Sequence, residues 1–213
     1  MKEKGMEIVY RVHNGLYVNL TNRCSSSCTF CLRQSLDRVG ESDPLWLERE
    51  PELDEVKAAF ARFDLASYDE IVFCGFGEPT CRLPLLLATA AWLRTVCDLP
   101  LRLNTNGQGS LINGRDITGE LAEVLDAVSV SLNHPDPERY RAIVRSRFGE
   151  EAYPAMLKFA ADCAAKGLDV TMTTVETTIS REEEQRCREI CADLGVKYRI
   201  RAWAGDTQSG AKG

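Results

Sequence analysis

The feature of this chain that most constrains its fold is a regular alternation of strand-like and helix-like segments. Short β-prone runs are expected to form six strands, at 16–21, 70–75, 100–107, 127–133, 169–176 and 196–203. The segments between them are expected to contain helices, at 53–63, 83–97, 119–125, 151–167 and 180–195. Such an alternation favours parallel strands joined by crossover helices. Six strands fall short of a full eight-stranded barrel, so we predict an α/β fold, a partial (β/α)6 TIM-like barrel.

Two strand-like runs flank Asn14-Gly15 near the start of the chain. This dipeptide is a strong hairpin signal because both residues tolerate the positive φ angles of a type I′ turn. We therefore predict an N-terminal β-hairpin extension that leads into the first barrel strand. The length of 213 residues fits one domain, expected over residues 1–203. The small and polar residues 204–213 are predicted to form a flexible C-terminal tail.

Several predicted strands alternate between apolar and polar residues, whereas parallel strands buried on both faces are usually apolar throughout. Ser131 and Asn133 lie opposite the valines of the strand at 127–133, and Arg199 and Arg201 lie opposite apolar residues of the last strand. Because helices must cover the apolar face, the polar face is expected to look into the barrel and to line a cavity for a polar substrate and cofactor. A solvated edge strand is the alternative interpretation of the charges in the last strand.

The composition argues against several classes of function. The net charge is −6 without a dense basic stripe, so nucleic-acid binding is not expected. No apolar run reaches the about 18 residues of a membrane span, and the first residues lack a signal-peptide core, so the sequence predicts a cytoplasmic protein without a membrane partner. In a reducing compartment, nine cysteines are expected to be metal ligands, redox groups or core residues. Only two histidines are present, which argues against a hydrolase built on imidazole ligands.

Three cysteines lie close together in "CSSSCTFC", at Cys24, Cys28 and Cys31, on the loop after the first barrel strand. Barrel folds of this kind place their chemistry at this end of the strands. Thiolates bind iron–sulfur clusters, zinc or copper(I), and a four-iron cluster held by three cysteines keeps one iron open to another ligand. A zinc site needs a fourth ligand, for which Cys187 and Cys191 would have to reach this loop. We predict a [4Fe–4S] cluster, with zinc and incidental thiols as the alternatives.

The spacing C-x3-C-x2-C, with Phe30 just before the last cysteine, resembles the radical S-adenosylmethionine (radical SAM) enzymes. "GFGEPT" after the second strand and the order of six strands extend the resemblance through most of the chain. The stretch "YVNLTNRCSSSCTFCLR" looks more narrowly like the TatD-associated radical SAM proteins. The resemblance implies that each of the three cysteines ligates one iron and that the fourth iron binds S-adenosylmethionine (SAM). It also implies that SAM is cleaved reductively to a 5′-deoxyadenosyl radical, which abstracts hydrogen from a substrate.

The resemblance further assigns SAM contacts to residues of this chain. Phe30 would support the adenine, and Gly75, Gly77 and Glu78 would receive the amino group of SAM. Phe76 stands within the Gly-Gly pair of the family motif, which leaves open which glycine carbonyl makes the contact. The remaining expected contacts lie at the ends of later strands, at Asn104, Asn106, Ser131, Asn133, Val175 and Glu176.

Five residues are candidates for catalysis or substrate binding. Cys81 just after the GEPT turn and His134 on the loop after the fourth strand are candidate catalytic groups, although a small buried residue is the simpler interpretation of Cys81. Arg33, Arg199 and Arg201 are candidates for bidentate binding of a substrate carboxylate or phosphate. The other cysteines and the other histidine are interpreted as structural, at Cys74, Cys97, Cys163, Cys187, Cys191 and His13.

The leading hypothesis is a radical SAM enzyme that acts on a small polar or anionic substrate and receives electrons from a donor such as flavodoxin or ferredoxin. An activase that generates a radical on a partner protein is an alternative within the same class. A non-enzymatic iron–sulfur or zinc-binding module is an alternative from another class. Nucleic-acid processing is suggested only by the TatD association, and two histidines in an acidic chain do not support it.

Overall fold

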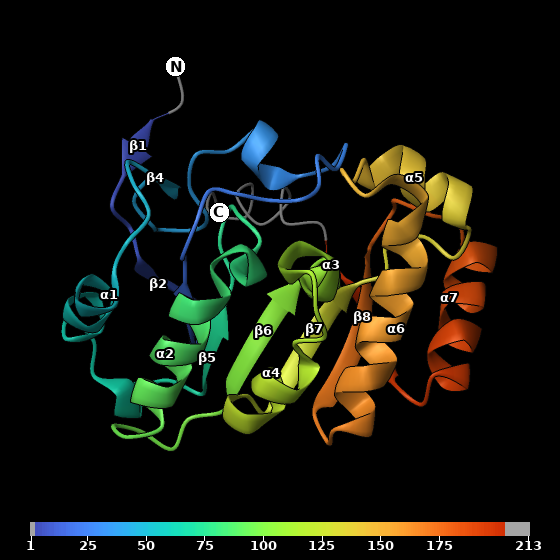
Figure 1. Cartoon of the computed structure of the whole chain (residues 1–213). Coiled ribbons are helices and arrows are strands. Elements are labelled where there is room, and N and C mark those ends of the chain that lie inside the picture. Colours follow the sequence, from blue (N-terminus) through green and yellow to red (C-terminus); the bar gives the residue numbers. More distant parts are fainter. Residues whose placement is uncertain (1–2, 203–213) are drawn as a thin grey trace.

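The computed structural model describes residues 3–202, and a single seven-stranded sheet forms its centre (Figure 1). In spatial order the strands are β2 (Val9–Val12), β3 (Gly15–Val18), β5 (Glu70–Phe73), β6 (Leu101–Thr105), β7 (Ala127–Ser131), β8 (Asp169–Val175) and β9 (Lys197–Arg201). β2 and β3 are antiparallel, and all the other neighbours are parallel. Within the described residues the edge strands β2 and β9 do not pair with each other. The predicted partial barrel of six parallel strands with a hairpin extension is confirmed, whereas the predicted tail at 204–213 lies outside the described residues.

Helices cover one face of this sheet (Figure 1). Five of them lie where the sequence predicts helices, at α1 (Leu53–Phe60), α2 (Leu83–Leu93), α4 (Thr118–Val124), α6 (Ala152–Ala165) and α7 (Arg181–Asp193). α7 begins with a capping box in which the side chains of Ser180 and Glu183 each accept the other's backbone N–H. Between residues 3 and 202 no helix combines the length and apolar character that a bilayer span requires.

Two helices and a small second sheet carry no clear signal in the sequence. α3 (Gly109–Asn113) is only five residues long. α5 (Pro137–Val144) begins at a proline within a polar stretch that reads as a loop, and Asp136 caps it by accepting two backbone N–H groups. β1 (Lys4–Gly5) pairs in parallel with the distant β4 (Trp46–Leu47). The short 3-10 turns are η1 (Leu32–Gln34), η2 (Leu65–Ser67), η3 (Pro79–Arg82) and η4 (Gly149–Glu151).

The N-terminal hairpin is present, but its turn lies one residue earlier than Asn14-Gly15 predicts. Val12 pairs with Gly15, so His13 and Asn14 form the turn and Gly15 begins β3. His13 adopts the positive φ angle, at 52°. This register places Tyr10 opposite Tyr17, with ring centroids 5.6 Å apart. A turn at Asn14-Gly15 would instead place Tyr10 opposite Asn19 and Tyr17 opposite Val12, so the observed register is the one that pairs the two rings directly.

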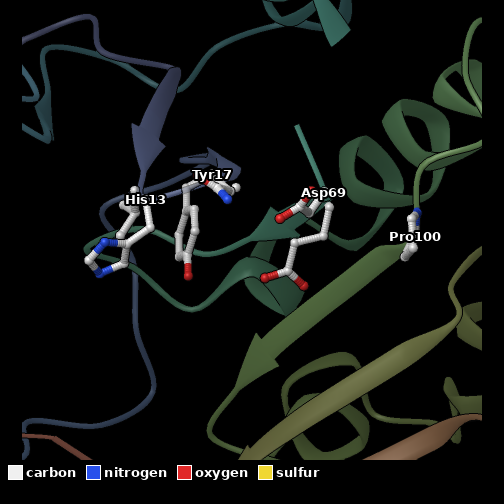
Figure 2. A pocket seen from close by; sticks show the side chains of 8 residues that line it. His13, Tyr17, Asp69 and Pro100 are labelled. Carbon is white, nitrogen blue, oxygen red and sulfur yellow. The ribbon is translucent and has the colours of Figure 1, made fainter. Parts of the chain in front are cut away.

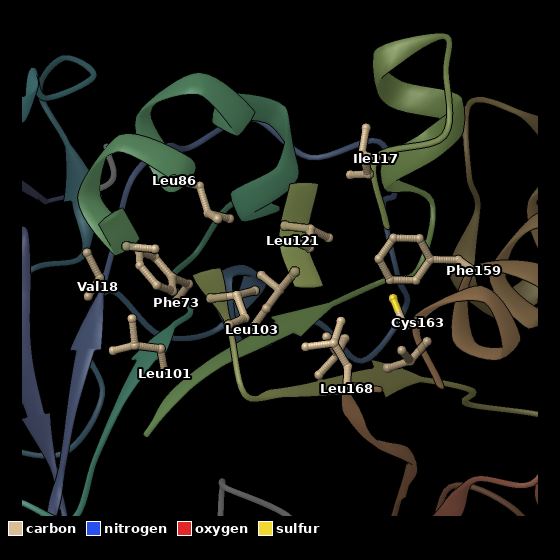
Figure 3. Packing of buried hydrophobic residues seen from close by; sticks show 14 of the residues in the cluster. Val18, Phe73, Leu86, Leu101, Leu103, Ile117, Leu121, Phe159, Cys163 and Leu168 are labelled. Atoms are coloured by element: carbon tan, nitrogen blue, oxygen red, sulfur yellow. The ribbon is translucent and has the colours of Figure 1, made fainter. Parts of the chain in front are cut away.

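The main hydrophobic core lies between the sheet and the helices (Figure 3). Leu103 of β6, Val130 of β7 and Phe159 of α6 are all buried in it. Each fully buried side chain of this size contributes about 1.5–3 kcal/mol of transfer free energy. Asn104 and Ser129 are paired neighbours on the opposite face. The alternation of the strands therefore separates an apolar face that packs against helices from a polar face that is free to line a site.

A second, smaller cluster lies beside the hairpin and contains the unusual phenylalanine of GFGEP. Phe76 is buried with Tyr10 and Leu45, and its ring meets that of Trp46 edge-on at 5.3 Å between centroids. Phe76 therefore anchors the segment around Trp46 against the turn after β5. This packing gives a structural reason for the departure from the Gly-Gly pair.

All nine cysteines are free thiols, and four of them are packing residues as the sequence predicts. Cys163, Cys187 and Cys191 are buried in the main core, and Cys97 packs against it. The Cys187–Cys191 pair of α7 thus packs between the helix and the sheet. The zinc alternative would require this pair to face the cysteine loop instead.

Candidate functional site

Cys24, Cys28 and Cys31 are half-buried thiols on the cysteine loop (residues 22–31), which follows β3 at the carboxyl ends of the parallel strands. Burial raises the pKa of Cys28 to about 12, and the neighbouring thiols of Cys24 and Cys31 contribute to that rise. Burial also raises the pKa of Cys24, with a further contribution from the carboxylate of Glu78. The three predicted ligands are therefore close enough to influence one another.

Backbone hydrogen bonds hold the cysteine loop against the end of α5. Figure 1 shows α5 on the opposite side of the sheet from β2. The N–H of Ser27 donates to the carbonyl oxygen of Val144 at 3.1 Å, and the N–H of Arg147 donates to that of Ser25 at 2.9 Å. An isolated antiparallel bridge completes the pairing. The middle of the cysteine loop is thus attached to the end of α5 and to the residues that follow it.

The serines between the first two cysteines are more than the small spacers that their size indicates. Ser25 and Ser26 are both buried, and both are hydrogen-bonded to Gln108, at 2.8 and 3.3 Å. Sequence reasoning missed Gln108 because its partners lie more than 80 residues away. A glutamine directly after the "NTNG" turn was the only available signal.

The glycines of GFGEP allow the turn after β5 to lie directly against the chain that leaves β3. A Cβ atom on Gly75 would lie 2.1 Å from Oδ1 of Asn19, and one on Gly77 would lie 2.2 Å from the carbonyl oxygen of Thr21. Real Cβ atoms do not approach other atoms this closely, so only glycine fits at either position. The motif and the cysteine loop therefore form one continuous surface.

Glu78 is a buried carboxylate that joins three segments. Its backbone N–H donates to the carbonyl oxygen of Arg23 at 2.7 Å. Its Oε1 accepts from the hydroxyls of Thr80 and Thr105 at 2.8 and 2.7 Å and from the backbone N–H of Thr80 at 3.2 Å. Its Oε2 accepts the backbone N–H of Asn106 at 2.8 Å. Burial raises the pKa of Glu78, and these hydrogen bonds oppose that rise. The expected contact to the amino group of SAM stays a prediction.

Asn106 and Asn104, two expected cofactor contacts, have different surroundings. Nδ2 of Asn106 donates to the hydroxyl of Ser25 at 2.9 Å and makes a longer N–H···S contact of 3.9 Å with Cys24. Oδ1 of Asn104 accepts from Arg102 at 2.5 Å, further down the polar face. Asn106 is therefore adjacent to a predicted metal ligand, whereas Asn104 belongs to the arginine-rich part of the barrel interior.

Asn133 has two unusual properties for a buried residue. Its φ angle is 62°, in the left-handed region, and its side chain is buried. Its Oδ1 has no hydrogen-bond partner among the described residues. Leaving a buried carbonyl oxygen unpaired costs about 1–3 kcal/mol. An acceptor held in this way at the end of a strand is suited to a ligand that brings a hydroxyl or amino donor.

The other expected SAM contacts surround the same end of the sheet. Ser131 pairs in register with Thr173 and is half-buried, and Val175 is the last, buried residue of β8. Glu176 is exposed after it. Phe30 is half-buried on the cysteine loop and is in neither hydrophobic cluster of the described chain. An aromatic ring outside the core is available to a ligand, so the assignment of Phe30 stays a prediction.

His134 is a buried side chain whose two ring nitrogens both have partners. Nδ1 accepts the backbone N–H of Asp136 at 3.0 Å, so Nε2 carries the proton and donates to Glu183 at 3.1 Å. These contacts attach the loop after β7 to the first turn of α7. The geometry therefore gives His134 a positioning role next to Asn133, and its candidate catalytic role stays a prediction.

Cys81, the other candidate catalytic group, is half-buried beside a surface groove of about 550 Å³. Burial raises its pKa to about 11, and Glu78 and Cys24 contribute to the rise. A thiol with a raised pKa is protonated at neutral pH and is a weak nucleophile. The other residues that line the groove are Arg23, Glu52, Leu53, Arg82, Pro84, Leu85 and Ala88.

Arg33, a candidate substrate-binding residue, bridges the cysteine loop and the GFGEP turn. Its guanidinium donates to the carbonyl oxygens of Asn22, Ser26 and Phe76 at 3.1–3.4 Å. It also lies 6.0 Å from the centroid of the Trp46 ring. These contacts stabilise the cysteine loop and account for the position of Arg33. Substrate binding by Arg33 stays a prediction.

Arg199 and Arg201, the other two candidates, lie on the polar face near Arg102. Desolvation lowers the pKa of Arg201, and the charges of Arg199 and Arg102 lower it further. Arg102 is paired with Glu70 at 2.6 Å, whereas neither Arg199 nor Arg201 has an ion-pair partner within residues 3–202. Both residues keep a large part of their surface exposed on β9, while the guanidinium of Arg201 lies close enough to the barrel interior to lose part of its hydration. Two adjacent unpaired guanidinium groups favour an anionic ligand.

A second hollow, of about 410 Å³, lies at the opposite end of the strands (Figure 2). Its walls include His13, Tyr17, Asp69 and Pro100. Asp69 and Pro100 directly precede β5 and β6, so the hollow is at the amino ends of the strands. Folds of this class place their chemistry at the carboxyl ends, where the cysteine loop lies.

The donor set of the cysteine loop fits an iron–sulfur cluster. Three thiols lie on one segment, and two N–H groups point at the sulfur of Cys24, from the backbone of Ser26 at 3.4 Å and from Asn106 at 3.9 Å. N–H···S contacts of this kind are typical around cluster ligands. Among the described residues no group of three or more His, Cys, Asp or Glu side chains surrounds a position for a single metal ion.

The comparisons with known proteins agree with this arrangement. The model of the Radical SAM superfamily matches residues 18–196. The chain is similar to the GTP 3′,8-cyclase 2 of Mycobacterium tuberculosis, with 31% identity over 198 residues, 89% of this chain and 50% of the relative. It is also similar to the GTP 3′,8-cyclase of Corynebacterium glutamicum, with 32% identity over 146 residues, 63% of this chain and 35% of the relative. The chain thus spans about half the length, or less, of these relatives.

Two solved structures share the fold at low sequence identity. Streptococcus suis SuiB bound to S-adenosylmethionine has a TM-score of 0.63 and 16% identity, covering 89% of this chain and 40% of that chain. Native anSMEcpe with bound AdoMet has a TM-score of 0.61 and 15% identity, covering 87% of this chain and 50% of that chain. These likenesses confirm the α/β partial barrel.

Proposed function

Because this chain belongs to the radical SAM superfamily, an enzyme family whose cofactors are a [4Fe–4S] cluster and SAM, we propose that it cleaves SAM reductively at a cluster held by Cys24, Cys28 and Cys31. The observation that carries the proposal is the set of three free, half-buried thiols on one loop, with two N–H groups directed at the sulfur of Cys24. When bound, the two cofactors supply a 5′-deoxyadenosyl radical that abstracts hydrogen from the substrate.

The residues around the cysteine loop are suited to hold SAM. Gly75 and Gly77 let the GFGEP turn lie directly against the chain that enters the loop, and Glu78 adds a carboxylate under it. The unpaired Oδ1 of Asn133 would accept a hydrogen bond from a ribose hydroxyl. Phe30 would lie against the adenine. These roles follow from the family resemblance. The buried, unpaired Oδ1 of Asn133 is the strongest support for them that does not depend on the resemblance.

The substrate that fits the barrel interior best is small and anionic. Arg199 and Arg201 have no ion-pair partner within residues 3–202 and are exposed on the polar face, beside the Arg102–Glu70 ion pair. A purine nucleoside triphosphate is the first compound to test, since the curated relatives carry the name GTP 3′,8-cyclase. Cyclisation of GTP is a separate proposal from binding of GTP, because this chain spans only about half the length of these relatives.

The remaining expectations belong to the same proposal. The narrower likeness to TatD-associated radical SAM proteins rests on the stretch around the three cysteines, whereas the relatives found by comparison carry the name GTP 3′,8-cyclase. A cytoplasmic location and an electron donor such as flavodoxin or ferredoxin complete the proposal. The activase alternative would require a protein in place of the small anion, and the exposed arginines of β9 argue for the small anion.

The experiment that tests the proposal is anaerobic reconstitution with iron and sulfide, followed by reduction with dithionite in the presence of SAM. We expect absorption near that of a four-iron cluster, iron and sulfide in equal amounts, and release of 5′-deoxyadenosine. Cys28→Ala is expected to abolish cluster binding, whereas Cys97→Ala, which changes a packing thiol outside the loop, is expected to keep it. An intact cluster that yields no 5′-deoxyadenosine would refute the proposed activity.

A further inference from the structure

Gln108 is a completely buried side chain that uses its whole hydrogen-bonding capacity inside the protein. Its Oε1 accepts from the hydroxyls of Ser25 and Ser146 at 2.8 and 2.7 Å. Its Nε2 donates to the hydroxyls of Ser26 and Tyr140 at 3.3 and 3.2 Å. A carboxamide can accept two hydrogen bonds and donate two, so these four hydroxyl groups occupy all of its hydrogen-bonding positions.

The four partners come from segments that are distant in sequence and meet only around this amide. Ser25 and Ser26 belong to the cysteine loop, Tyr140 lies on α5, and Ser146 follows α5. Gln108 itself precedes α3, at the end of β6. The two serines lie between the first two predicted cluster ligands, so the path of the chain from one ligand to the next depends on the amide.

The contacts continue from Gln108 to the sulfur of Cys24. The hydroxyl of Ser25 donates to Gln108 and accepts from Nδ2 of Asn106 at 2.9 Å. The same Nδ2 lies 3.9 Å from Sγ of Cys24, and the N–H of Ser26 lies 3.4 Å from it. Both N–H groups that face this sulfur therefore move if the serines move. Hydrogen bonds to the sulfurs of a cluster, together with local charge and solvent access, set its reduction potential.

We propose that Gln108 is a positioning residue that fixes the cysteine loop in its ligand-binding conformation before iron arrives and thereby sets the hydrogen bonding at Cys24; this inference rests on the proposed cluster site. Gln108 touches neither the thiols nor the expected position of SAM. Its effect passes through Ser25, Ser26 and Asn106. A rigid loop also loses less conformational freedom when the cluster binds.

The test uses three variants and one matched control. Gln108→Leu removes all four hydrogen bonds at similar volume, Gln108→Glu keeps the shape and adds a buried negative charge, and Ser146→Ala removes one bond from outside the cysteine loop. The control is Thr118→Val, because Thr118 is equally buried and hydrogen-bonded, but to Asp116 and Lys166. Thermal unfolding of every protein measures the purely structural part of each change.

Two measurements on the reconstituted holoprotein separate positioning from packing. We expect Gln108→Leu to lose iron to a chelator at least 10-fold faster than the unmodified chain, and Ser146→Ala to show a smaller change in the same direction. We expect Gln108→Glu to shift the midpoint potential, followed by electron paramagnetic resonance, to a more negative value. Thr118→Val is expected to melt earlier with neither quantity changed. Variants that melt earlier but keep the unmodified rate and potential would overturn the proposal.

A measurement on the iron-free chain keeps this inference separate from the proposed function. The N–H of Ser27 and of Thr29 are bonded to the carbonyl oxygens at the end of α5, so their hydrogen exchange reports on the loop without a cluster. We expect at least 10-fold faster exchange at both positions in Gln108→Leu, and at most a small change in Thr118→Val. Unchanged exchange in Gln108→Leu and Ser146→Ala would refute the role of Gln108, whereas failure of the unmodified chain to bind a cluster would refute the proposed function alone.

Discussion

Gly77 passes so close to Thr21 that a Cβ atom on the glycine would lie 2.2 Å from the threonine carbonyl oxygen. This approach joins the GFGEP turn to the cysteine loop. We expect Gly77→Ala to lower the free energy of unfolding by about 1–3 kcal/mol, because the obstacle is backbone that cannot turn away. Loss of cluster and SAM binding is expected with it. Denaturant unfolding and iron content measure the two effects.

A second glycine-to-alanine substitution, within helix α4, provides the control. Gly119 lies within α4, and a Cβ there would meet only Cε of Lys166, at 3.7 Å. Gly119→Ala is expected to raise the free energy of unfolding by about 0.5–1 kcal/mol through helix propensity. Equal destabilisation by the two substitutions would mean that the contact between Gly77 and Thr21 has no special importance.

Substitutions of Asn133 are expected to change the stability of the fold and the affinity for SAM independently of each other. Glycine adopts a φ of 62° without strain, so Asn133→Gly is expected to keep the melting temperature while removing the unpaired Oδ1. We expect SAM to bind about 2- to 10-fold more weakly, the equivalent of one hydrogen bond. Asn133→Ala is expected to show the same loss of affinity and also to lose about 1–2 kcal/mol of stability from the left-handed backbone. Equilibrium binding of SAM to the reconstituted protein checks both; undiminished affinity in Asn133→Gly would exclude Asn133 as a ligand contact.

The carboxylate of Glu183, which accepts hydrogen bonds from Ser180 and His134, predicts a dependence of stability on pH. The backbone N–H of Ser180 lowers the pKa of Glu183, and His134 contributes. A carboxylate with a lowered pKa stabilises the fold when ionised, so this contribution is present above the ordinary value of 4.5 and is lost as pH falls through the lowered pKa. We expect Glu183→Gln, which keeps an acceptor for the N–H of Ser180 but removes the charge at the start of α7, to cost about 0.3–1 kcal/mol at pH 7 and almost nothing at strongly acidic pH.

Glu182, the neighbouring acid in the same first turn of α7, is the matched control for that series. Glu182→Gln is expected to change stability little at any pH, because the side chain is exposed. Urea unfolding of the three proteins across the acidic range gives the comparison. A difference between Glu183→Gln and the unmodified chain that persists undiminished at low pH would contradict the role assigned to the charge.

The arginines of β9 predict a selective loss of anion binding. Arg201→Gln is expected to weaken binding of GTP, used as the probe anion, by about 10- to 100-fold, as for loss of a hydrogen bond to a charged group. SAM cleavage in the absence of substrate is expected to continue. Arg188→Gln is the control, because Arg188 stacks on Tyr198 on the helix-covered side, 5.2 Å from the ring centroid. Calorimetric titration at low and high salt measures the binding, and equal losses in the two variants would point to a general charge effect.

The sequence predicts the fold well where the signal is local. The two faces of β6 and β7 are already visible in the alternation of Leu103 with Asn104 and of Val130 with Ser129, and the structure confirms both. The family, the enzyme class and the two cofactors of that class are predicted from the cysteine spacing and are confirmed by the superfamily match. Element ends are less accurate, because helices and strands stop where tertiary contacts end.

The surroundings of the site carry almost no local signal. Gln108 contacts Ser25 across 83 positions and Tyr140 across 32, and no periodic pattern records such pairs. His134 looks like a free catalytic group until Glu183, 49 positions later, is seen to hold it. The hairpin turn was displaced by the pairing of Tyr10 with Tyr17, a cross-strand contact. In each case a long-range contact decided what the local sequence left open.

The distance along the chain between the cysteine loop and its supports also sets the order of events during synthesis. The thiols emerge from the ribosome early, but Ser25 needs Gln108 and the backbone of Arg147 before the loop has its final shape. Translation at about 5–20 residues per second leaves an interval on the order of ten seconds. During that interval three reactive thiols are present on an unfixed segment. The nascent chain is therefore most exposed to oxidation and to wrong metals before α5 has folded. Correct loading of iron follows translation of the segment after α5, which contains Arg147.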